Sequence, residues 1–474
     1  MNQSHRIGRS VTFGTFTAIG ALFCGLSAAD AQTTPAPGAG AFPGSLLIPG
    51  TNTSLKIGGY AKVDYMYDMG ATQNFNANGA GTSALVNIIP LDDNIHGSVA
   101  NGAHSIHGDS QLSAAESRFN IETRTPTGFG ELKTFIEGDF EGASGVTAGN
   151  TFQDNSNRSA FSLRHAYGTL GPLLAGQYFS LFEDTAAFVE TLDFGGAIGV
   201  SGPLRQAQFR YVYSVGNGFT IAGSIENPQT MIVTTAENNV NNEFGTSVTQ
   251  GLAQGDKIPD FVGALIFGQG PGHIALRGVV RDLYDHGPAN VLNAGATTPA
   301  NASTVGWGVG LSGDLHVFGP DDIIFQVNGG KGIGRYITNS GESPGDSVIS
   351  ADGHTLRAVT QLGGVVAYQH WWVPAVLRSN IEGSIIQSHY PNGLFAGSSI
   401  SNPGAVVATL VDDAAPTGSL GSLNRRLISS HLNLIWSPVP PVDLGVEGIW
   451  EERSTVAGQT GHIERAQVSA KFKF

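Results

Sequence analysis

Apolar and polar side chains alternate along much of this chain. Residues 55–68, LKIGGYAKVDYMYD, place apolar side chains at alternate positions, with Lys62 and Asp64 among the polar residues between them. The C-terminal segment RAQVSAKFKF repeats the pattern and ends on Phe474. Successive side chains of a strand point to opposite sides, so both segments predict strands with one apolar and one charged face. The C-terminal segment alone is compatible with the edge strand of a soluble sandwich or with the closing strand of an outer-membrane barrel.

The same alternation recurs through the chain and predicts about sixteen strands. The first, 55–68, is longer than a typical strand of a soluble protein. The others lie near 117–124, 130–140, 161–170, 173–179, 205–214, 218–226, 258–268, 272–283, 304–316, 322–330, 357–370, 376–389, 426–436, 442–453 and 462–474.

The connections between these strands alternate between short and long. The short ones have the Gly and Pro content of tight turns: TPTGF, GP, VGNG, GQGP, VFGPD, WWVPA and SPVPPV. The long ones include 69–116, 180–204, 227–257 and 390–425. Short turns on one side and long loops on the other are typical of membrane barrels. We therefore predict an all-β fold in which residues 55–474 form a transmembrane antiparallel β-barrel of about sixteen strands.

The N-terminal residues have the layout of an export signal. Basic residues precede the apolar stretch VTFGTFTAIGALFCGLSA, and the small residues Ala29 and Ala31 flank Asp30. This predicts a cleaved signal peptide over 1–31 and a flexible periplasmic lead-in, rich in Pro and Gly, over 32–54. The single cysteine, Cys24, lies in the signal, so we expect no disulfide in the mature protein.

Composition agrees with an exported barrel. The chain has 66 glycines and only 13% charged residues, and no apolar run after residue 31 approaches the length of a membrane-spanning helix. The net charge of −14 argues against a nucleic-acid partner. The expected surroundings are outer-membrane lipid on one face of the wall and small hydrophilic solutes on the other.

Most basic residues of the mature chain share the parity that faces the lumen. A Lys or Arg facing hydrocarbon at mid-depth costs about 2–4 kcal/mol, so this parity is physically constrained. The candidate solute-binding residues are Lys62, Arg118, Arg124, Arg164, Arg205, Arg210 and Arg277. Inward acids such as Glu137, Glu382 and Glu447 leave a second interpretation open, in which paired charges only keep the wall polar and rigid.

The connection 180–204 combines acids with aromatic and aliphatic residues that an exposed loop does not need. Its acids are Glu183, Asp184, Glu190 and Asp193, and no basic residue follows before Arg205. We expect this loop to fold inward, to constrict the pore and to set its acids opposite arginines, which selects solutes by size and charge. The alternative is a surface loop used in subunit contact.

The run from SRFNIETRTPTGFGELKTFIEGDFEG through FSLRHAYGTLGPLLAGQYFSLFEDTAAFVETLDFGG to RQAQFRY resembles the DcaP-like family of trimeric outer-membrane porins. The resemblance is most specific over residues 117–213. It implies a sixteen-stranded barrel, a homotrimer, and diffusion of small, often anionic, solutes such as dicarboxylates through a positively lined constriction. The arginines in the matching segments are Arg118, Arg124, Arg164, Arg205 and Arg210. Unlike family members with a coiled-coil-like extension, residues 32–54 contain no heptads.

Other functions lack the residues they require. Ser388 and His389 are adjacent and face opposite sides of a strand, and no G-x-S-x-G motif occurs, so we predict no enzyme. No His spacing indicates a metal site or cofactor, and His96, His104 and His107 belong to a Gly- and Asn-rich loop. A plugged receptor of about 22 strands needs a longer chain. A structural or adhesin barrel, and a general or sugar-permeable porin, stay open as alternatives.

Overall fold

The computed structural model describes residues 38–69, 89, 108–142, 160–200, 204–233, 248–249, 255–270, 272–285, 301–337, 345–349, 355–391, 424–456, 458 and 460–474. The predicted signal peptide, with Cys24, and the histidines His96, His104 and His107 lie outside these residues. Within the described ranges, no helix is both long enough and apolar enough to cross a membrane.

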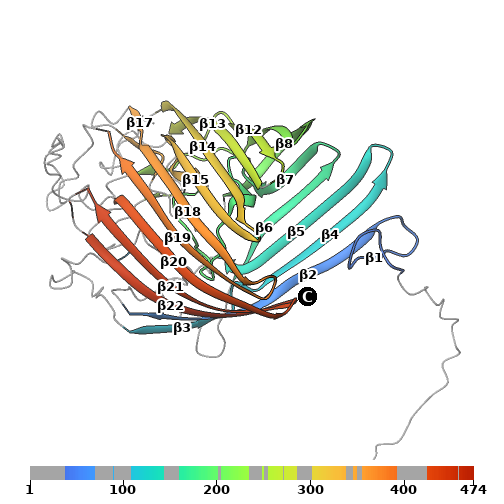
Figure 1. Ribbon diagram of the computed structural model, residues 1–474. Helices are drawn as coiled ribbons and strands as arrows, with labels where there is room; N and C mark the ends of the chain where they lie inside the picture. The colour runs from blue at the N-terminus through green and yellow to red at the C-terminus, as the bar shows by residue number, and fades with distance from the viewer. Residues whose placement is uncertain are drawn as a thin grey trace, which may run out of the picture.

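Among the described residues, sixteen antiparallel strands form one closed barrel (Figure 1). They are β2 (Ser54–Asp68), β4 (Arg118–Thr127), β5 (Gly130–Gly142), β6 (Ala160–Leu170), β7 (Leu173–Phe179), β8 (Arg205–Gly216), β9 (Phe219–Glu226), β12 (Asp260–Gly268), β13 (Gly272–Asp285), β14 (Ala302–Phe318), β15 (Asp321–Lys331), β18 (Thr360–Val373), β19 (Leu377–His389), β20 (Asn424–Val439), β21 (Val442–Thr455) and β22 (Thr460–Lys473). The all-β barrel predicted from the alternation is confirmed.

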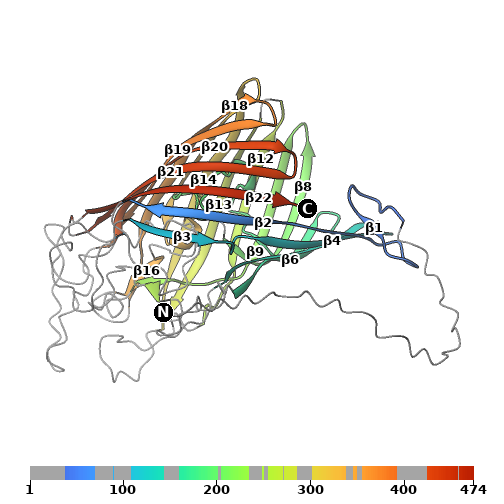
Figure 2. The same cartoon turned by 90° about the horizontal axis from the view of Figure 1, so that it is seen from below.

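The barrel closes between its first and last strands. β2 pairs with β22 in a register that runs from Tyr60 opposite Lys473 to Asp68 opposite Arg465. Figure 2 shows the two strands side by side, with β3 (Asp109–Ser113) next to β2. β3 pairs with one end of β2 and β4 pairs with the other end, so these two segments together complete the wall.

Several short elements lie outside the alternating pattern. β10 (Ile232–Val233), β11 (Val248–Thr249), β16 (Ser347–Ile349) and β17 (Leu356–Ala358) form a small separate sheet. β1 (Leu46–Leu47) pairs with the start of β2, so the described part of the lead-in has contacts with the barrel. The 3₁₀ turns among the described residues are η4 (Thr185–Ala187) and η5 (Gly334–Tyr336). The sequence analysis missed β1, β3, β10, β11 and β16 and joined most of β17 to β18 in the predicted strand 357–370, because two to five residues are too few to establish a period.

The short connections are hairpin turns. Asn217 and Gly218 join β8 to β9 with φ angles of 52° and 82°. Positive φ at both central residues is what a type I′ hairpin turn requires. β18 continues to Val373 and β20 to Val439, so the predicted turns WWVPA and SPVPPV are partly strand.

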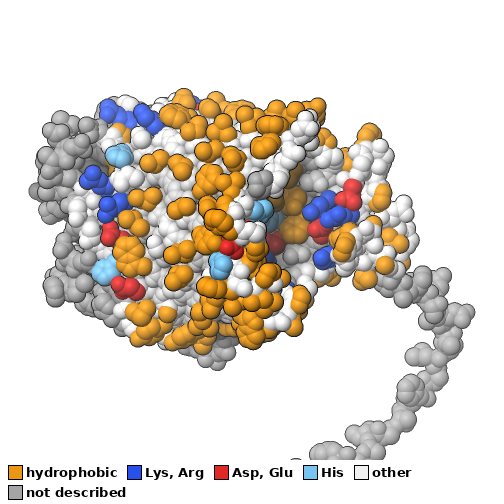
Figure 3. Space-filling view, in the orientation of Figure 1, with side chains coloured by type: hydrophobic (Ala, Val, Ile, Leu, Met, Phe, Trp, Pro, Cys, Tyr) orange, Lys and Arg blue, Asp and Glu red, His pale blue; other side chains and the backbone are white. Residues whose placement is uncertain are grey.

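The distribution of side chains is the reverse of that in a water-soluble protein. Apolar residues such as Phe209 and Val366 are exposed on the outer wall, 73% and 60% respectively, whereas the lumen-parity residues Lys62 and Gln326 are buried. On the face in Figure 3, hydrophobic side chains spread over the middle of the wall and most charged ones lie toward its ends. This is the arrangement expected of a wall between lipid and a polar lumen.

Candidate functional site

The connection between β7 and β8 leaves the barrel wall and returns to it at the same height along the barrel. Its flanking residues Phe179 and Arg205 are register partners in the sheet. We name its described part, residues 180–200, the lumen loop. Because β7 has only seven residues, the chain turns inward well before it has run the length of its neighbours.

The lumen loop bonds to strands on several sides of the barrel. The backbone N–H of Leu181 donates to Glu226 of β9 at 2.8 Å. Gln326 of β15 donates to the carbonyl oxygen of Ala187 at 2.9 Å. Asn328 of the same strand donates to the carbonyl oxygen of Gly199 at 3.2 Å. The wall side chains in these bonds are buried, so the loop lies inside the barrel and not over its rim.

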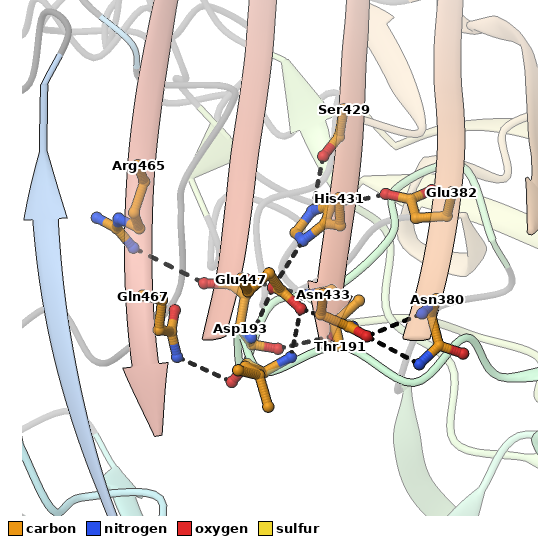
Figure 4. Close-up of polar contacts among 12 residues, drawn as sticks. Thr191, Asp193, Asn380, Glu382, Ser429, His431, Asn433, Glu447, Arg465 and Gln467 are labelled. Atoms are coloured by element: carbon orange, nitrogen blue, oxygen red, sulfur yellow. Dashed lines mark hydrogen bonds and ion pairs between the residues drawn. The ribbon is translucent and has the colours of Figure 1, made fainter. Parts of the chain in front are cut away.

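Glu447 of β21 holds the middle of the lumen loop. Its carboxylate accepts the backbone N–H groups of Leu192 at 2.7 Å and Asp193 at 3.1 Å. The same carboxylate contacts His431 Nδ1 at 3.0 Å and accepts Asn433 Nδ2 at 2.9 Å (Figure 4). Several donors on one buried carboxylate fix both its charge and the position of the loop.

Two loop acids form ion pairs with lumen arginines. Arg378 of β19 donates to both carboxylate oxygens of Glu190, Nε at 2.6 Å and Nη2 at 2.5 Å. Asp193 lies 3.7 Å from Arg465 Nη1, and its Oδ2 accepts the N–H of Gly196. The bidentate pair combines charge with a fixed geometry. Acids of the loop therefore do face arginines, although Arg378 and Arg465 are not among the seven candidates.

Asp184 is the N-cap of η4 and is held by side chains of β13 and β14. Its Oδ2 contacts His273 Nε2 at 2.9 Å and accepts the hydroxyl of Ser312, whose oxygen accepts Arg277 Nη2 at 2.6 Å. Burial tends to raise the pKa of Asp184, but the hydrogen bonds from His273 and Ser312 outweigh it and hold the pKa below its ordinary value. Asp184 is therefore a carboxylate.

Glu183 differs from its neighbour. Its side chain is buried, and burial raises its pKa well above the ordinary value, although nearby Arg205 opposes this. Two adjacent acids of the lumen loop thus have opposite shifts, which sequence position does not reveal.

Glycines let the lumen loop approach the wall. Gly199 has a φ of 67°, and a Cβ there would clash with the carbonyl oxygen of Ile385 and stand 2.7 Å from the backbone nitrogen of Gly364. A Cβ on Gly363 would stand 2.7 Å from the oxygen of Gly199, and one on Gly445 would meet Leu192 at 2.8 Å. Backbone contact with the wall is possible only because these side chains are absent.

The candidate arginines of β4 and β6 are paired with acids. Arg118 lies 3.6 Å from Glu137 and 3.9 Å from Asp139, and Arg164 also contacts both carboxylates. The pairing of β5 with β6 explains why two consecutive residues, Arg164 and His165, are both buried. The register shifts between Glu137 and Gly138, and this shift interrupts the alternation of β6. These two arginines match the interpretation of a rigid, paired wall.

Arg205, Arg210 and Arg277 are different, because none forms an ion pair with a described carboxylate. Arg205 lies over the ring of Phe179 at 4.9 Å and Arg210 over that of Tyr178 at 5.4 Å. Within the described part of the chain, Arg205 Nε and Arg277 Nε and Nη1 are buried and form no hydrogen bond. These three N–H groups are therefore hydrogen-bond donors without a partner among the described residues.

The other two candidates lie elsewhere. Arg124 is near the β4–β5 turn, with Glu122 at 2.6 Å and the ring of Phe42 at 4.4 Å. Lys62 contacts Glu116 and Asp64 and donates to the carbonyl oxygen of Leu192 at 2.8 Å. The structure therefore does not gather all seven candidates at one point, and Lys62 is occupied in holding the loop.

A second inward network lies around η5. Arg281 contacts Asp260 and Asp346, both at 3.0 Å, and Tyr336 donates to Asp260 at 2.7 Å. The Tyr336 ring lies 5.6 Å from that of Phe182 in the lumen loop. The segment around η5 thus packs on the lumen loop and supports it.

Sequence reasoning missed three features. It identified Glu382 and Glu447 as inward acids but gave no signal that Glu447 clamps the loop or that His431 lies between them, with Glu382 Oε1 3.6 Å from His431 Nε2. It also missed the Asp314, His316 and Asp322 group at the β14–β15 hairpin. The alternation of side chains could have placed all of these residues on the lumen face of the wall. It could not have shown which of them lie close enough to contact one another.

Comparisons with known proteins agree with this architecture. Residues 38–287 match a family model described as a porin subfamily. Porin Omp2b of Brucella suis biovar 1 is 26% identical over 285 residues, which cover 58% of this chain and 66% of that protein. Porin Omp2b of Brucella melitensis biotype 1 matches over the same shares at the same identity. The chain thus spans about two thirds, 66%, of the length of these relatives.

Among solved structures, the crystal structure of the outer membrane channel DcaP of Acinetobacter baumannii is similar. The TM-score is 0.63 at 22% sequence identity, over 89% of this chain and 97% of that chain. The similarity concerns the fold.

Proposed function

Because the chain belongs to the porin family whose model matches residues 38–287, we propose that it forms a passive diffusion channel for small hydrophilic solutes. The family places it in the bacterial outer membrane, and porins are channels and not enzymes. Membership also confirms the porin family that the sequence analysis predicted. The homotrimer implied by the resemblance is part of this proposal.

The lumen loop supplies the constriction in this proposal. It carries Asp184 to β13 and β14, Glu190 to β19 and Leu192 to β21, so it spans the lumen from one wall to another. A solute that crosses the barrel must pass beside these residues. A loop held by buried hydrogen bonds on several strands acts as a fixed filter.

We propose a preference for small anions such as dicarboxylates. The observation that carries it is the set Arg205, Arg210 and Arg277, which form no ion pair with the described carboxylates. Buried acids such as Glu382 and Glu451 also line the wall, which creates a transverse field. Each charge across a wet pore contributes on the order of 1–4 kcal/mol, depending on the local dielectric. Salt screens it over about 8–10 Å.

Planar-bilayer recordings of the purified protein across a KCl gradient test both parts. We expect stepwise conductance and a reversal potential of the sign that chloride permeation produces. A closed barrel with no conductance contradicts the channel. A reversal potential near zero instead identifies the general porin, and a cation-selective one shows that the acids dominate.

A further inference from the structure

Three side chains of the types that can coordinate a metal ion lie close together at the β14–β15 hairpin. Asp314 and His316 belong to β14, and Asp322 belongs to β15 directly opposite His316 in the register. One ligand atom of each residue lies within 4.8 Å of the other two, and His316 Nδ1 contacts Asp322 Oδ1. We name these residues the hairpin triad. A tight hairpin carries all three ligands, so little chain entropy is lost when they converge.

The hairpin triad lies on the lumen side of the wall, at the short-turn end. Ser312, two residues before Asp314, bonds to Asp184 of the lumen loop. The register partner of Asp314 on β13 is His273, which also bonds to Asp184. Residues two apart on a strand share one face, so the triad continues the wall from the lumen loop toward the turn at Gly319.

An independent observation concerns Asp314. Its Oδ1 is a buried atom that forms no hydrogen bond within the described part of the chain. No described lysine or arginine forms an ion pair with any member of the triad, and the titratable groups beyond the triad that act on Asp314 are His273 and Asp184. A buried carboxylate oxygen without a donor is costly, and a cation is one way to satisfy it.

The donor set selects the kind of cation. Two carboxylates with one imidazole suit borderline ions, above all Zn²⁺, whereas Mg²⁺ and Ca²⁺ prefer oxygen ligands alone. The His316 side chain is 52% exposed and that of Asp322 14%, so water can enter and complete the coordination. We propose that Asp314, His316 and Asp322 bind a divalent transition-metal ion, best Zn²⁺, on the lumen wall between the lumen loop and the short-turn mouth.

Bound Zn²⁺ would neutralise the two carboxylates of the hairpin triad. In the proposed anion channel, this strengthens the preference for anions beside Asp184, because an ion within a low-dielectric wall dominates the local field. This consequence rests on the proposed function, whereas metal binding itself does not.

Equilibrium dialysis of the purified, folded protein against ZnCl₂, with elemental analysis of the bound metal, tests the site. We expect a saturable site of one Zn²⁺ per chain that is lost in His316→Ala and weakened on the order of tenfold or more in Asp322→Asn. Millimolar Ca²⁺ should not displace it. His462→Ala is the matched control, since His462 is exposed and lies 3.7 Å from the carboxylate of Glu464 but belongs to no described group of three metal-binding side chains.

The result is decisive in either direction. Equal Zn²⁺ binding by wild type and His316→Ala, or equal loss in His462→Ala, overturns the proposal. Heat-modifiability on unboiled gels shows that each variant is folded. Bilayer recordings with and without Zn²⁺ then separate the proposed channel from the proposed metal site. Zn²⁺ binding without conductance contradicts the channel and supports the metal site. Conductance without Zn²⁺ binding supports the channel and contradicts the metal site.

Discussion

The backbone N–H of Leu192 donates to the carboxylate of Glu447 at 2.7 Å, across 255 residues of sequence. This bond joins the lumen loop to a strand on the far side of the barrel. Since the same carboxylate also accepts the N–H of Asp193, two peptide groups of the loop depend on one side chain. The position of the loop is therefore set by the wall more than by its own sequence.

Replacing that carboxylate should release the loop. Glu447→Gln has one acceptor oxygen for the donors of Leu192, Asp193, His431 and Asn433, and a buried unsatisfied donor costs about 1–3 kcal/mol. We expect larger or noisier single-channel conductance. Glu452→Gln on the same strand, which removes a pair with Arg426, should leave conductance unchanged. Equal conductance of Glu447→Gln and wild type would show that the clamp does not hold the loop.

A methyl group at the loop–wall contact should have a similar effect by another route. In Gly199→Ala, the added Cβ clashes with Ile385, and the φ of 67° disfavours any side chain. We expect a displaced loop, seen as faster limited proteolysis, and a lower unfolding temperature. Gly448→Ala is the control, because no atom lies within 4 Å of a Cβ there. If both variants resist protease equally, the contact at Gly199 is not tight.

Removing one unpaired arginine should alter ion selectivity. Arg277→Gln takes away a buried positive charge beside the loop and keeps a donor for Ser312. We expect a shift of the reversal potential toward cations and slower dicarboxylate uptake into proteoliposomes, with a larger shift when Arg205 and Arg210 are also replaced by Gln. Arg425→Gln, at an exposed end of β20, changes the same net charge and should have little effect. Identical shifts from both single variants would mean that total charge, not position, decides.

The C-terminal ring should matter for assembly. Phe474 is exposed on the outside, and its N–H and carbonyl bond to the carbonyl and N–H of Gly59 at 3.1 and 3.3 Å. A charge near the membrane interface costs up to about 1 kcal/mol, and the substitution also removes the apolar ring that the interface favours. Phe474→Asp should therefore lower the amount of heat-modifiable protein in the outer membrane. Phe129→Asp, in the exposed β4–β5 turn, should not. Normal abundance of Phe474→Asp contradicts an anchoring role.

Periodicity predicted the strands well because, in a wall between lipid and water, each outward side chain must be apolar and most inward side chains are polar. β7 was predicted at its observed bounds, and Arg277 and Lys62 lie on the buried, lumen-facing parity. The pattern fails where the register shifts, as at Arg164 and His165. It also cannot show which lumen charges are paired. Arg118 lies within ion-pair distance of two carboxylates, whereas Arg277 forms no direct ion pair with a described carboxylate, and only the path of the folded chain decides this.

The pairing of Tyr60 with Lys473 has a consequence for the order of events in biogenesis. The two residues are separated by about 400 positions, and bringing such distant segments together carries a large loop-closure entropy and slows folding. The seam between β2 and β22 forms only after β22 has been synthesised and exported, so until then β2 lacks its partner strand and has an unpaired edge in the periplasm. Such edges invite aggregation. We therefore expect this chain to need periplasmic holdase chaperones, which protect unpaired strands from aggregation until the barrel closes.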